Sequence, residues 1–439
     1  MTIVPLGSPD LARILSQCAG DRSLEEIAYS ASVSKEALMS FLSELQNVGV
    51  VDFNDTPVEH RVLSRLGPSG PWLREVHIDV TDKCNLATFC RHCFRGSMLN
   101  QGADHPTEEW LSVIRDIAHM GAATVALSGG ELFMRRDIPV ILKEIFENGL
   151  FCSAIFTNGT LRTREMEQTL DFIIRHGLHT SFYISLDGFD DASHDANRGE
   201  GSYRRTRDFV EYLVARKRET GAVFSVVVNS QINTHNFHSL ITWYDEMKKM
   251  GIDKWRLTSG RIVGRLAENN HLVPPVESLF REYVQLIQSH VADVSASATD
   301  MTLNIESFFR TNMLVEKRAL TFREDTVICD YKQNACSIEP NGNVQFCTSW
   351  GSRVFGNVFT EGIREVWRGE ELQQLKSMRI EEIAECRGCT LLEFCGGGCR
   401  LTAETVKSRD AIACERYQLF VQDILPLLQR ENIAFVSNP

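Results

Sequence analysis

Apolar and polar residues alternate with two different periods along the middle of the chain. Strand-like stretches, alternating or continuously apolar, lie at residues 76–80, 123–127, 151–156, 180–186, 223–230 and 254–258. Between them, apolar residues recur at the helical spacing of three to four, at residues 108–119, 138–147, 163–176, 203–218 and 240–250. This alternation predicts parallel strands joined by crossover helices, hence an α/β fold with a partial (β/α)6 TIM-like barrel. Its chemistry is expected at the carboxyl ends of the strands, where the βα loops gather.

Residues 8–53 have the pattern of a small helical module. Three short amphipathic stretches each follow a serine that can cap a helix, namely Ser8, Ser23 and Ser34. Residues 50–53 read as a short strand, and residues 67–71, Gly-Pro-Ser-Gly-Pro, read as a linker. Three helices and a strand predict a winged-helix module at residues 1–66. Such a module can bind DNA, bind a peptide or be purely structural.

Composition and charge narrow the possible partners. The 439 residues are 43% hydrophobic and 24% charged, as in ordinary globular proteins. The net charge of -12 disfavours nucleic acid and anionic membranes as partners, and we predict neither. The start of the chain lacks a basic region followed by an apolar one, and no run of about 18 apolar residues occurs. A cytoplasmic location is therefore predicted.

The thirteen cysteines favour metal binding, because a chain without an export signal is not expected to use a disulfide framework. Three of them, Cys84, Cys90 and Cys93, lie within ten residues, directly after the first predicted strand. Cys18 and Cys152 stand apart and are expected to be structural. Three thiolates on one loop leave one iron of a four-iron cluster open. Taken alone, this cysteine group also permits a zinc or redox site.

The loops after the later strands add to this pattern. Ser128-Gly129-Gly130-Glu131 follows the second strand, Thr157-Asn158-Gly159-Thr160 the third and Ser185-Leu186-Asp187-Gly188 the fourth, with Arg198-Gly199 further on. Together with the cysteine loop, these segments resemble the radical S-adenosylmethionine (SAM) enzymes. The usual spacing in that family is Cys-x3-Cys-x2-Cys, whereas here residues 85–89 make the first gap five residues long.

The resemblance implies a 4Fe-4S cluster on Cys84, Cys90 and Cys93 with SAM bound to its open iron. His92 and the Phe94 backbone would lie near adenine, and Asn158 near a ribose hydroxyl. Ser185 and Arg198 would bind the methionine amine and carboxylate. The remaining implied cofactor-binding residues are Gly129, Gly130, Glu131, whose carboxylate would accept from the methionine amine, and Asp187 in the turn after the fourth strand.

The C-terminal cysteines have a second pattern. Gly342-x4-Cys347 and Cys386-x2-Cys389-x5-Cys395-x3-Cys399-x14-Cys414 resemble the SPASM domain, whose members mature peptides and proteins. The resemblance implies a first auxiliary cluster on Cys329, Cys336, Cys347 and Cys399 and a second on Cys386, Cys389, Cys395 and Cys414. Two zinc sites are the alternative for eight thiolates. Residues 341–343, Asn-Gly-Asn, predict a hairpin that brings Cys336 near Cys347.

These patterns predict five parts: the winged helix (1–66), a radical SAM core (72–272), bridging helices (273–320), a SPASM domain (321–420) and a C-terminal helix and tail (421–439). The N-terminal module resembles the leader-recognition module of peptide-modifying enzymes, although at most one strand fits before its first helix. The cysteine patterns predict three 4Fe-4S clusters. The resemblance of the N-terminal module implies that a leader peptide binds near residues 50–53 and the third helix.

The family resemblance implies a radical SAM peptide maturase. It would cleave SAM to a 5′-deoxyadenosyl radical, abstract hydrogen from a ribosomally made precursor peptide and form a cross-link, with a flavodoxin- or ferredoxin-type electron donor. One alternative is a sulfatase-type maturase that oxidises a Ser or Cys side chain. Those enzymes place Asp after the cysteine corresponding to Cys347, where this chain has Thr348. The other is a cluster-sensing DNA-binding regulator, which the single base of the third helix, Lys35, disfavours.

Overall fold

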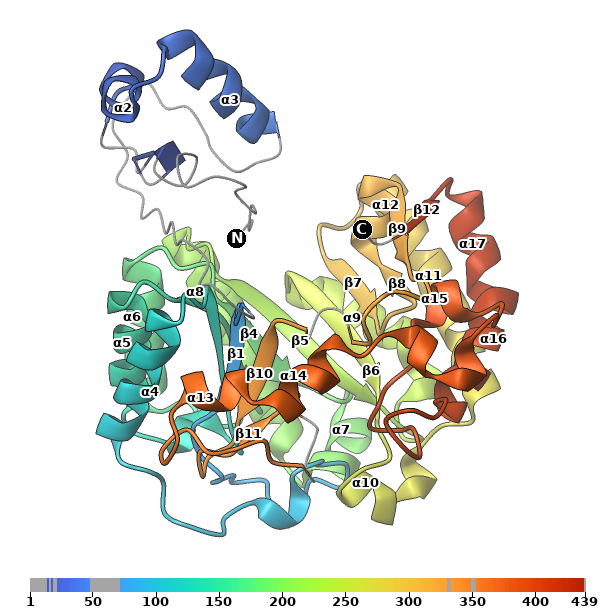
Figure 1. Cartoon of the computed structure of the whole chain (residues 1–439). Coiled ribbons are helices and arrows are strands. Elements are labelled where there is room, and N and C mark those ends of the chain that lie inside the picture. Colours follow the sequence, from blue (N-terminus) through green and yellow to red (C-terminus); the bar gives the residue numbers. More distant parts are fainter. Residues whose placement is uncertain are drawn as a thin grey trace. The chain divides into compact units, whose positions relative to one another are not determined.

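A computed structural model describes residues 14, 15, 17, 18, 22–47, 72–329, 333–348 and 353–437 (Figure 1). The chain divides into two compact units, Met1–Trp72 and Leu73–Pro439, and each is described by itself. Within the described residues, no helix is both long enough and apolar enough to cross a membrane.

The first unit contains helices α2 (Leu24–Ala31) and α3 (Lys35–Asn47). The hydroxyl of Ser23 accepts from the Glu26 backbone amide while the Glu26 carboxylate accepts from the Ser23 amide, so α2 begins with a capping box. A small core joins the helices through Ile14, Leu15, Ile27, Ala28, Ala31, Leu38, Leu42 and Leu45. The second and third predicted helices are confirmed. The predicted strand and linker lie outside the described residues, so the winged helix stays a prediction.

The second unit is built on a parallel sheet. Its central strands are β1 (Glu75–Asp79), β2 (Thr124–Ser128), β3 (Phe151–Thr157), β4 (Ser181–Ser185), β5 (Ser225–Ile232) and β6 (Lys254–Ser259), each parallel to the next. The crossover helices are α4 (Thr107–His119), α5 (Ile138–Glu147), α6 (Arg164–Arg175), α7 (Asp191–Arg198), α8 (Ser202–Thr220) and α9 (Leu240–Met250). All six predicted strands and the five predicted helices are confirmed.

The sheet is larger than predicted, with ten strands in the order β11-β10-β1-β2-β3-β4-β5-β6-β7-β8. β7 (Thr302–Ile305) adds parallel to β6, and β8 (Phe309–Arg310) turns back antiparallel. At the other edge, β10 (Ala335–Ile338) adds parallel to β1 and forms the predicted hairpin with β11 (Val344–Gln345). Residues 273–320 are therefore more than bridging helices. They contain α11 (Val276–Ser295), β7, β8, α12 (Thr311–Glu316) and most of β9 (Arg318–Thr321).

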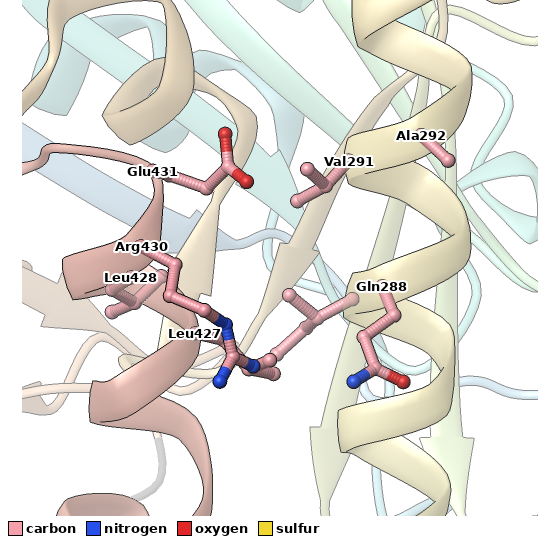
Figure 2. A pocket seen from close by; sticks show the side chains of 8 residues that line it. Gln288, Val291, Ala292, Leu427, Leu428, Arg430 and Glu431 are labelled. Atoms are coloured by element: carbon pink, nitrogen blue, oxygen red, sulfur yellow. The ribbon is translucent and has the colours of Figure 1, made fainter.

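The C-terminal part of this unit consists of short elements. They are α13 (Ile363–Arg368), α14 (Glu370–Ser377), α15 (Leu392–Cys395), α16 (Ala411–Leu419), a π-helical turn (Phe420–Ile424), α17 (Leu425–Arg430) and β12 (Ala434–Ser437). β12 pairs with β9 in a separate two-stranded sheet. Between α11 and α17 lies a pocket of about 260 Å³ (Figure 2), whose lining includes Val291, Leu427 and Leu428 and none of the predicted site residues.

The two faces of the large sheet differ. One face carries the fully buried apolar residues of the core, such as Val76, Ile78, Phe182 and Leu257, which pack with residues of the helices. On β4 to β7 the other face carries mostly half-buried residues at the alternate positions, and most of these are polar. Because successive strand residues point to opposite faces, the strand pattern separates a packed outer face from an accessible inner face. The site must therefore be sought on the inner face and at the strand ends.

Ser230 joins three strands in the core. Its hydroxyl donates to the Leu186 carbonyl (2.6 Å) and accepts from the Trp255 indole (2.9 Å), and it is fully buried. Ser230→Ala should lower the free energy of unfolding by about 1–3 kcal/mol, since it leaves a buried acceptor and a buried donor unpaired. Denaturant titration measures this. Ser181→Ala, at a half-buried β4 position, is the matched control and should change stability less; equal losses would contradict the argument.

Candidate functional site

Cys84, Cys90 and Cys93 lie in the turns that follow β1. Burial raises the pKa of Cys84 to about 12, and the charges of Glu131, Cys90 and Cys93 act in the same direction. Burial also acts to raise the pKa of Cys90, but the positive charges of His92 and Arg198 outweigh it and lower this pKa to about 7. The three thiols thus share one electrostatic environment. Three soft sulfur donors on one short loop fit an iron–sulfur cluster with one open iron.

Arg265, at the start of α10 (Arg265–Glu268), holds this loop together and was missed by the sequence analysis. Its guanidinium donates to the carbonyls of Ala87, Cys90 (3.3 Å) and Gly96 (3.4 Å), and its own backbone amide donates to the Cys93 carbonyl (3.1 Å). A Cβ on Gly96 would lie only 2.5 Å from the Arg265 side chain. The guanidinium therefore fills the space inside the cysteine loop. Since these contacts are to backbone atoms, no residue pattern within the loop reveals them.

The five-residue gap after Cys84 is held in place by hydrogen bonds to the turn after β3. The side-chain amide of Asn85 donates to the Thr160 hydroxyl (2.8 Å), and the side-chain amide of Asn158 donates to Asn85 Oδ1 (2.9 Å). Asn158 accepts in turn from the backbone and the hydroxyl of Thr160. Asn158, predicted to meet a ribose, therefore also links the turn after β3 to the long gap.

Positions 129 and 130 require glycine because the backbone of residues 81–83, which leads into the cysteine loop, passes close to them. A Cβ on Gly129, whose φ is +157°, would lie 2.6 Å from the Thr81 carbonyl, and a Cβ on Gly130 would lie 2.5 Å from the Lys83 carbonyl. The Gly130 amide donates to the Thr81 carbonyl (2.9 Å) and the Glu131 amide to that of Lys83 (2.7 Å). The close backbone approach that the glycines allow is thus to the chain itself.

Glu131 is buried and makes several hydrogen bonds. Its carboxylate accepts from the Thr157 hydroxyl (2.7 Å), the Asn158 amide (2.6 Å) and the Phe133 amide (3.2 Å). Burial raises its pKa, against which these hydrogen bonds act. Glu131 therefore braces the end of β3, and its expected contact with the methionine amine stays a prediction.

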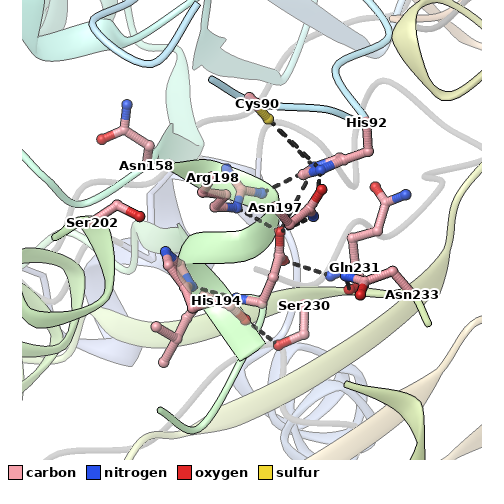
Figure 3. Close-up of polar contacts among 12 residues, drawn as sticks. Cys90, His92, Asn158, His194, Asn197, Arg198, Ser202, Ser230, Gln231 and Asn233 are labelled. Atoms are coloured by element: carbon pink, nitrogen blue, oxygen red, sulfur yellow. Dashed lines mark hydrogen bonds and ion pairs between the residues drawn. The ribbon is translucent and has the colours of Figure 1, made fainter. Parts of the chain in front are cut away.

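Asp187 connects β4, β5 and α7. Its partners His194, Asn197, Arg198 and Gln231 are labelled in Figure 3. Its carboxylate accepts from Arg198 Nε (2.5 Å), Asn197 Nδ2 (3.2 Å) and the Gln231 amide (2.8 Å), and its amide donates to His194 Nδ1 (3.0 Å). Burial opposes ionisation, yet the positive charge of Arg198 helps to hold the pKa of Asp187 below its usual value. Asp187 is thus occupied by the chain, and its effect on a ligand passes through Arg198.

The other predicted SAM-binding residues are His92 and Phe94, on the cysteine loop itself, and Ser185, at the end of β4. The His92 ring lies between Asn197 Nδ2 (2.7 Å from Nδ1) and Arg198 Nη2 (3.3 Å from Nε2), with the Cys90 sulfur 3.7 Å from Nδ1. Phe94 is 43% exposed, so its side chain is accessible to a ligand. Ser185 is half-buried at the carboxyl end of β4. His92 and Arg198 thus lie beside the Cys90 thiol, while the place of Ser185 beside SAM stays a prediction.

Four of the C-terminal cysteines form one group. Burial raises the pKa of Cys386, and the nearby charges of Cys389 and Cys414 contribute. Burial likewise raises the pKa of Cys395 to about 12, with contributions from Cys414 and Cys386. This is the set expected for the second auxiliary cluster, and its four thiols fit one.

Three of the four cysteines expected at the first auxiliary cluster also lie together. Burial raises the pKa of Cys329 to about 11, with contributions from Cys399 and Cys347. Cys336 is placed differently. It pairs with Val76 across β10 and β1 and is buried in the hydrophobic core, 2% exposed. Its role as the fourth ligand stays a prediction.

Cys395 and Cys399 join different groups although three residues separate them. The intervening Gly396, Gly397 and Gly398 all have left-handed φ angles, of +61°, +82° and +74°. Only glycine adopts such a run without strain, so the chain can turn from one thiol group to the other. The buried Arg400 follows, and its positive charge acts on thiols of both groups, Cys329 and Cys386. Of the two isolated cysteines, Cys152 is buried as expected and Cys18 is half-buried.

Among the described residues, no three or more His, Cys, Asp or Glu side chains converge closely enough to hold a single metal ion. A cubane cluster makes a different demand, because its thiolates bind different irons. Thiols that lie near one another without converging on one point are compatible with this demand.

Comparison with known proteins agrees with this geometry. Residues 78–241 match the Radical SAM superfamily, and residues 329–390 match SPASM, an iron-sulfur cluster-binding domain. The AdoMet-dependent heme synthase of Nitratidesulfovibrio vulgaris is 26% identical over 77% of this chain and 90% of its own length. The mycofactocin maturase MftC of Mycolicibacterium smegmatis is 27% identical over 73% of this chain and 76% of its own. The structure of Streptococcus suis SuiB bound to its precursor peptide SuiA has the same fold, with a TM-score of 0.61 and 16% identity over 89% of each chain.

The chain therefore contains a radical SAM domain at residues 78–241 and a SPASM iron–sulfur domain at residues 329–390. These two domains indicate an enzyme, and they imply SAM and iron–sulfur clusters as its cofactors.

Replacing Arg265 tests its hold on the cysteine loop. Arg265→Gln should reduce the iron bound on anaerobic reconstitution by up to about four irons, the content of one cubane, because three loop carbonyls lose their donor. Iron analysis and the electron paramagnetic resonance signal of the SAM-binding cluster measure this. Arg265→Lys, which keeps the charge without the planar fork, should recover only part of the iron. Arg204→Gln, on the exposed surface of α8, is the control. Full iron content and an unchanged signal in Arg265→Gln would contradict this assignment.

Proposed function

We propose that this enzyme matures a ribosomally made precursor peptide and forms a cross-link in it. The observation that carries the proposal is the presence, in one compact unit, of a SAM-type cysteine loop and two further thiol groups. It is supported by the maturase among its relatives and by the likeness of its fold to a structure with bound precursor peptide. An electron donor of the flavodoxin or ferredoxin type would supply electrons.

The described residues divide the work as follows. Cys84, Cys90 and Cys93 would hold the SAM-binding cluster, and the eight C-terminal cysteines would hold two more, making three 4Fe-4S clusters. When bound, SAM and the cluster would supply the radical chemistry needed to abstract hydrogen from an unactivated carbon. Arg265 fixes the shape of the loop that would present the thiolates. His92, Asn158, Ser185 and Arg198 would orient SAM, and the barrel would shield the reacting groups from water.

A second candidate is the modification of a tetrapyrrole. It is favoured by the AdoMet-dependent heme synthase, which aligns with this chain over 90% of its own length. The sulfatase-type alternative is disfavoured because this chain has Thr348 at the position where those enzymes place an Asp. The DNA-binding alternative is further disfavoured because Lys35, the one base expected on the third helix, forms an ion pair with Glu25. Peptide maturation and tetrapyrrole modification are separated by offering the enzyme a precursor peptide from a neighbouring reading frame or an iron porphyrin and measuring which of the two it modifies.

Removing the three loop thiols tests the cluster assignment. Wild-type protein, reconstituted without oxygen, should bind about twelve irons, and the Cys84→Ala, Cys90→Ala, Cys93→Ala triple variant about four fewer. The variant should make no 5′-deoxyadenosine, because no open iron remains to bind SAM. Iron analysis and chromatography of the products measure both. A triple variant that still cleaves SAM would show that the active cluster lies elsewhere.

The first unit is proposed to hold the leader of the precursor, by strand addition and an apolar contact with α3. Deleting residues 1–60 should then weaken binding of the precursor at least tenfold, while SAM cleavage and iron content stay intact, because tethering raises the local concentration of the core peptide. Fluorescence anisotropy with a labelled precursor measures the affinity. Tyr29→Ala, at an exposed α2 position, tests whether this helix contributes. Unchanged affinity in the deletion would make the unit a structural appendage.

A further inference from the structure

A row of polar residues crosses the inner face of the sheet. The register pairs Ser185 with Asn229, Asn229 with Arg256, and Arg256 with Asn304 across β4 to β7. Asn304 then pairs with Arg310 of β8. Residues paired directly across a ladder point to the same face, so these five side chains form one line. Lys254 lies two residues before Arg256 and therefore shares its face.

This face is accessible, and its cations lack acidic partners. Ser185, Asn229, Lys254, Arg256 and Asn304 are half-buried and Arg310 is exposed. The Arg256 guanidinium donates to the Asn229 side-chain oxygen (3.3 Å). Within the described part of the chain, Lys254, Arg256 and Arg310 form no ion pair. Lys254 and Arg256 thus share one face of β6, Arg310 lies beyond Asn304 in the same row, and this row contains no carboxylate.

The neighbouring carboxylates are already paired. Asp253, next to Lys254, accepts from Lys217 Nζ (2.5 Å) and from the Val226 amide (2.7 Å). Glu306, in the turn between β7 and β8, pairs with Arg416 (3.0 Å). Burial lowers the pKa of Lys254, and the positive charges of Arg256 and Arg310 lower it further. The cluster therefore repels itself, and an added carboxylate would relieve that repulsion.

We propose that Lys254, Arg256 and Arg310 form a binding site for a carboxylate of the substrate. This deepens the proposed function and rests on it for the view that the substrate enters the barrel. Arg256 lies two strands from Ser185, so its Cα is about 10 Å from the residue expected to bind the methionine amine. An arginine side chain spans much of that distance. The carboxylate would therefore be held close to the carbon that loses hydrogen, and it would fix which carbon that is.

The proposal identifies the ligand by its chemistry, and two sources supply it. One is an Asp or Glu side chain or the C-terminus of a peptide, and the other is a propionate of a tetrapyrrole. Because the cations lie along a row and not at a single point, a carboxylate can contact Arg256 and one neighbour at once. Arginine forms paired hydrogen bonds to a carboxylate, and a neutral amide gains much less.

The experiment measures binding to the reconstituted enzyme with SAM present. The peptide probes are N-acetylated, C-amidated pentapeptides, Gly-Gly-Xaa-Gly-Gly, with Glu, Gln or Lys as Xaa. The tetrapyrrole probes are haem and its dimethyl ester. Calorimetry should show the acid bound about tenfold more tightly than its neutral partner in at least one pair. Arg256→Glu and Lys254→Glu should abolish that preference and Arg256→Gln should reduce it, whereas Arg204→Glu should leave it unchanged. Iron content and circular dichroism show that each variant is folded.

The outcomes separate the two proposals. If the acid is favoured in the haem pair alone, the carboxylate site stands and peptide maturation falls. If wild-type enzyme binds acid and neutral partners equally in both pairs, the carboxylate site is wrong, whatever the enzyme matures. If Arg256→Glu weakens SAM binding and leaves the preference unchanged, the row serves the methionine carboxylate and the proposal is overturned.

Discussion

The buried carboxylate of Asp187 is the interaction on which the arrangement of the site depends. A fully buried carboxylate is stable only if its charge is paired and its oxygens accept hydrogen bonds, and breaking such a pair costs several kcal/mol. Here the donors come from the next strand and from α7, which follows the turn. The need to satisfy one anion thus fixes α7 relative to the sheet. Arg198 and Asn197 on that helix contact His92, so the same anion orients the loop that carries the thiols.

The strands of the central barrel could be predicted because their outer faces are continuously apolar. Leu257 and Trp255 are buried by the same alternation that leaves Arg256 half-buried, and that alternation is visible in the sequence. β7 and β8 were not predicted, and β10 and β11 were predicted only as a hairpin and not as part of the sheet, because β8 and β11 have two residues each and β7 and β10 four. At that length, apolar periodicity does not distinguish a strand from a loop. Their place is set by pairing with β6 and β1, which is a tertiary effect.

The site was predictable only in part, because only some of its residues belong to patterns that are visible in the sequence. The cysteines, Glu131 and Asp187 stand out because their side chains carry chemistry and follow strand ends. Arg265 does not, because it acts on carbonyl groups about 170 residues earlier in the chain. In the structure, the side chains of Glu131 and Asp187 also make most of their hydrogen bonds within the chain itself. A motif therefore identifies the residues at a site more reliably than it identifies which atoms they contact.

The long gap between Cys84 and Cys90 explains why an arginine lies inside the loop. Each residue added to a loop adds a carbonyl and an amide that need partners if they are shielded from water. A lysine offers a compact group of donors, whereas the planar guanidinium of Arg265 reaches carbonyls on opposite sides of the loop at once. The left-handed Gly264 (φ +57°), whose Cβ would lie 2.5 Å from the Phe94 carbonyl, allows the backbone to come close enough for this. Gly264 and Arg265 therefore compensate for the longer gap: together they hold a larger loop in a conformation that still keeps its three thiols close to one another.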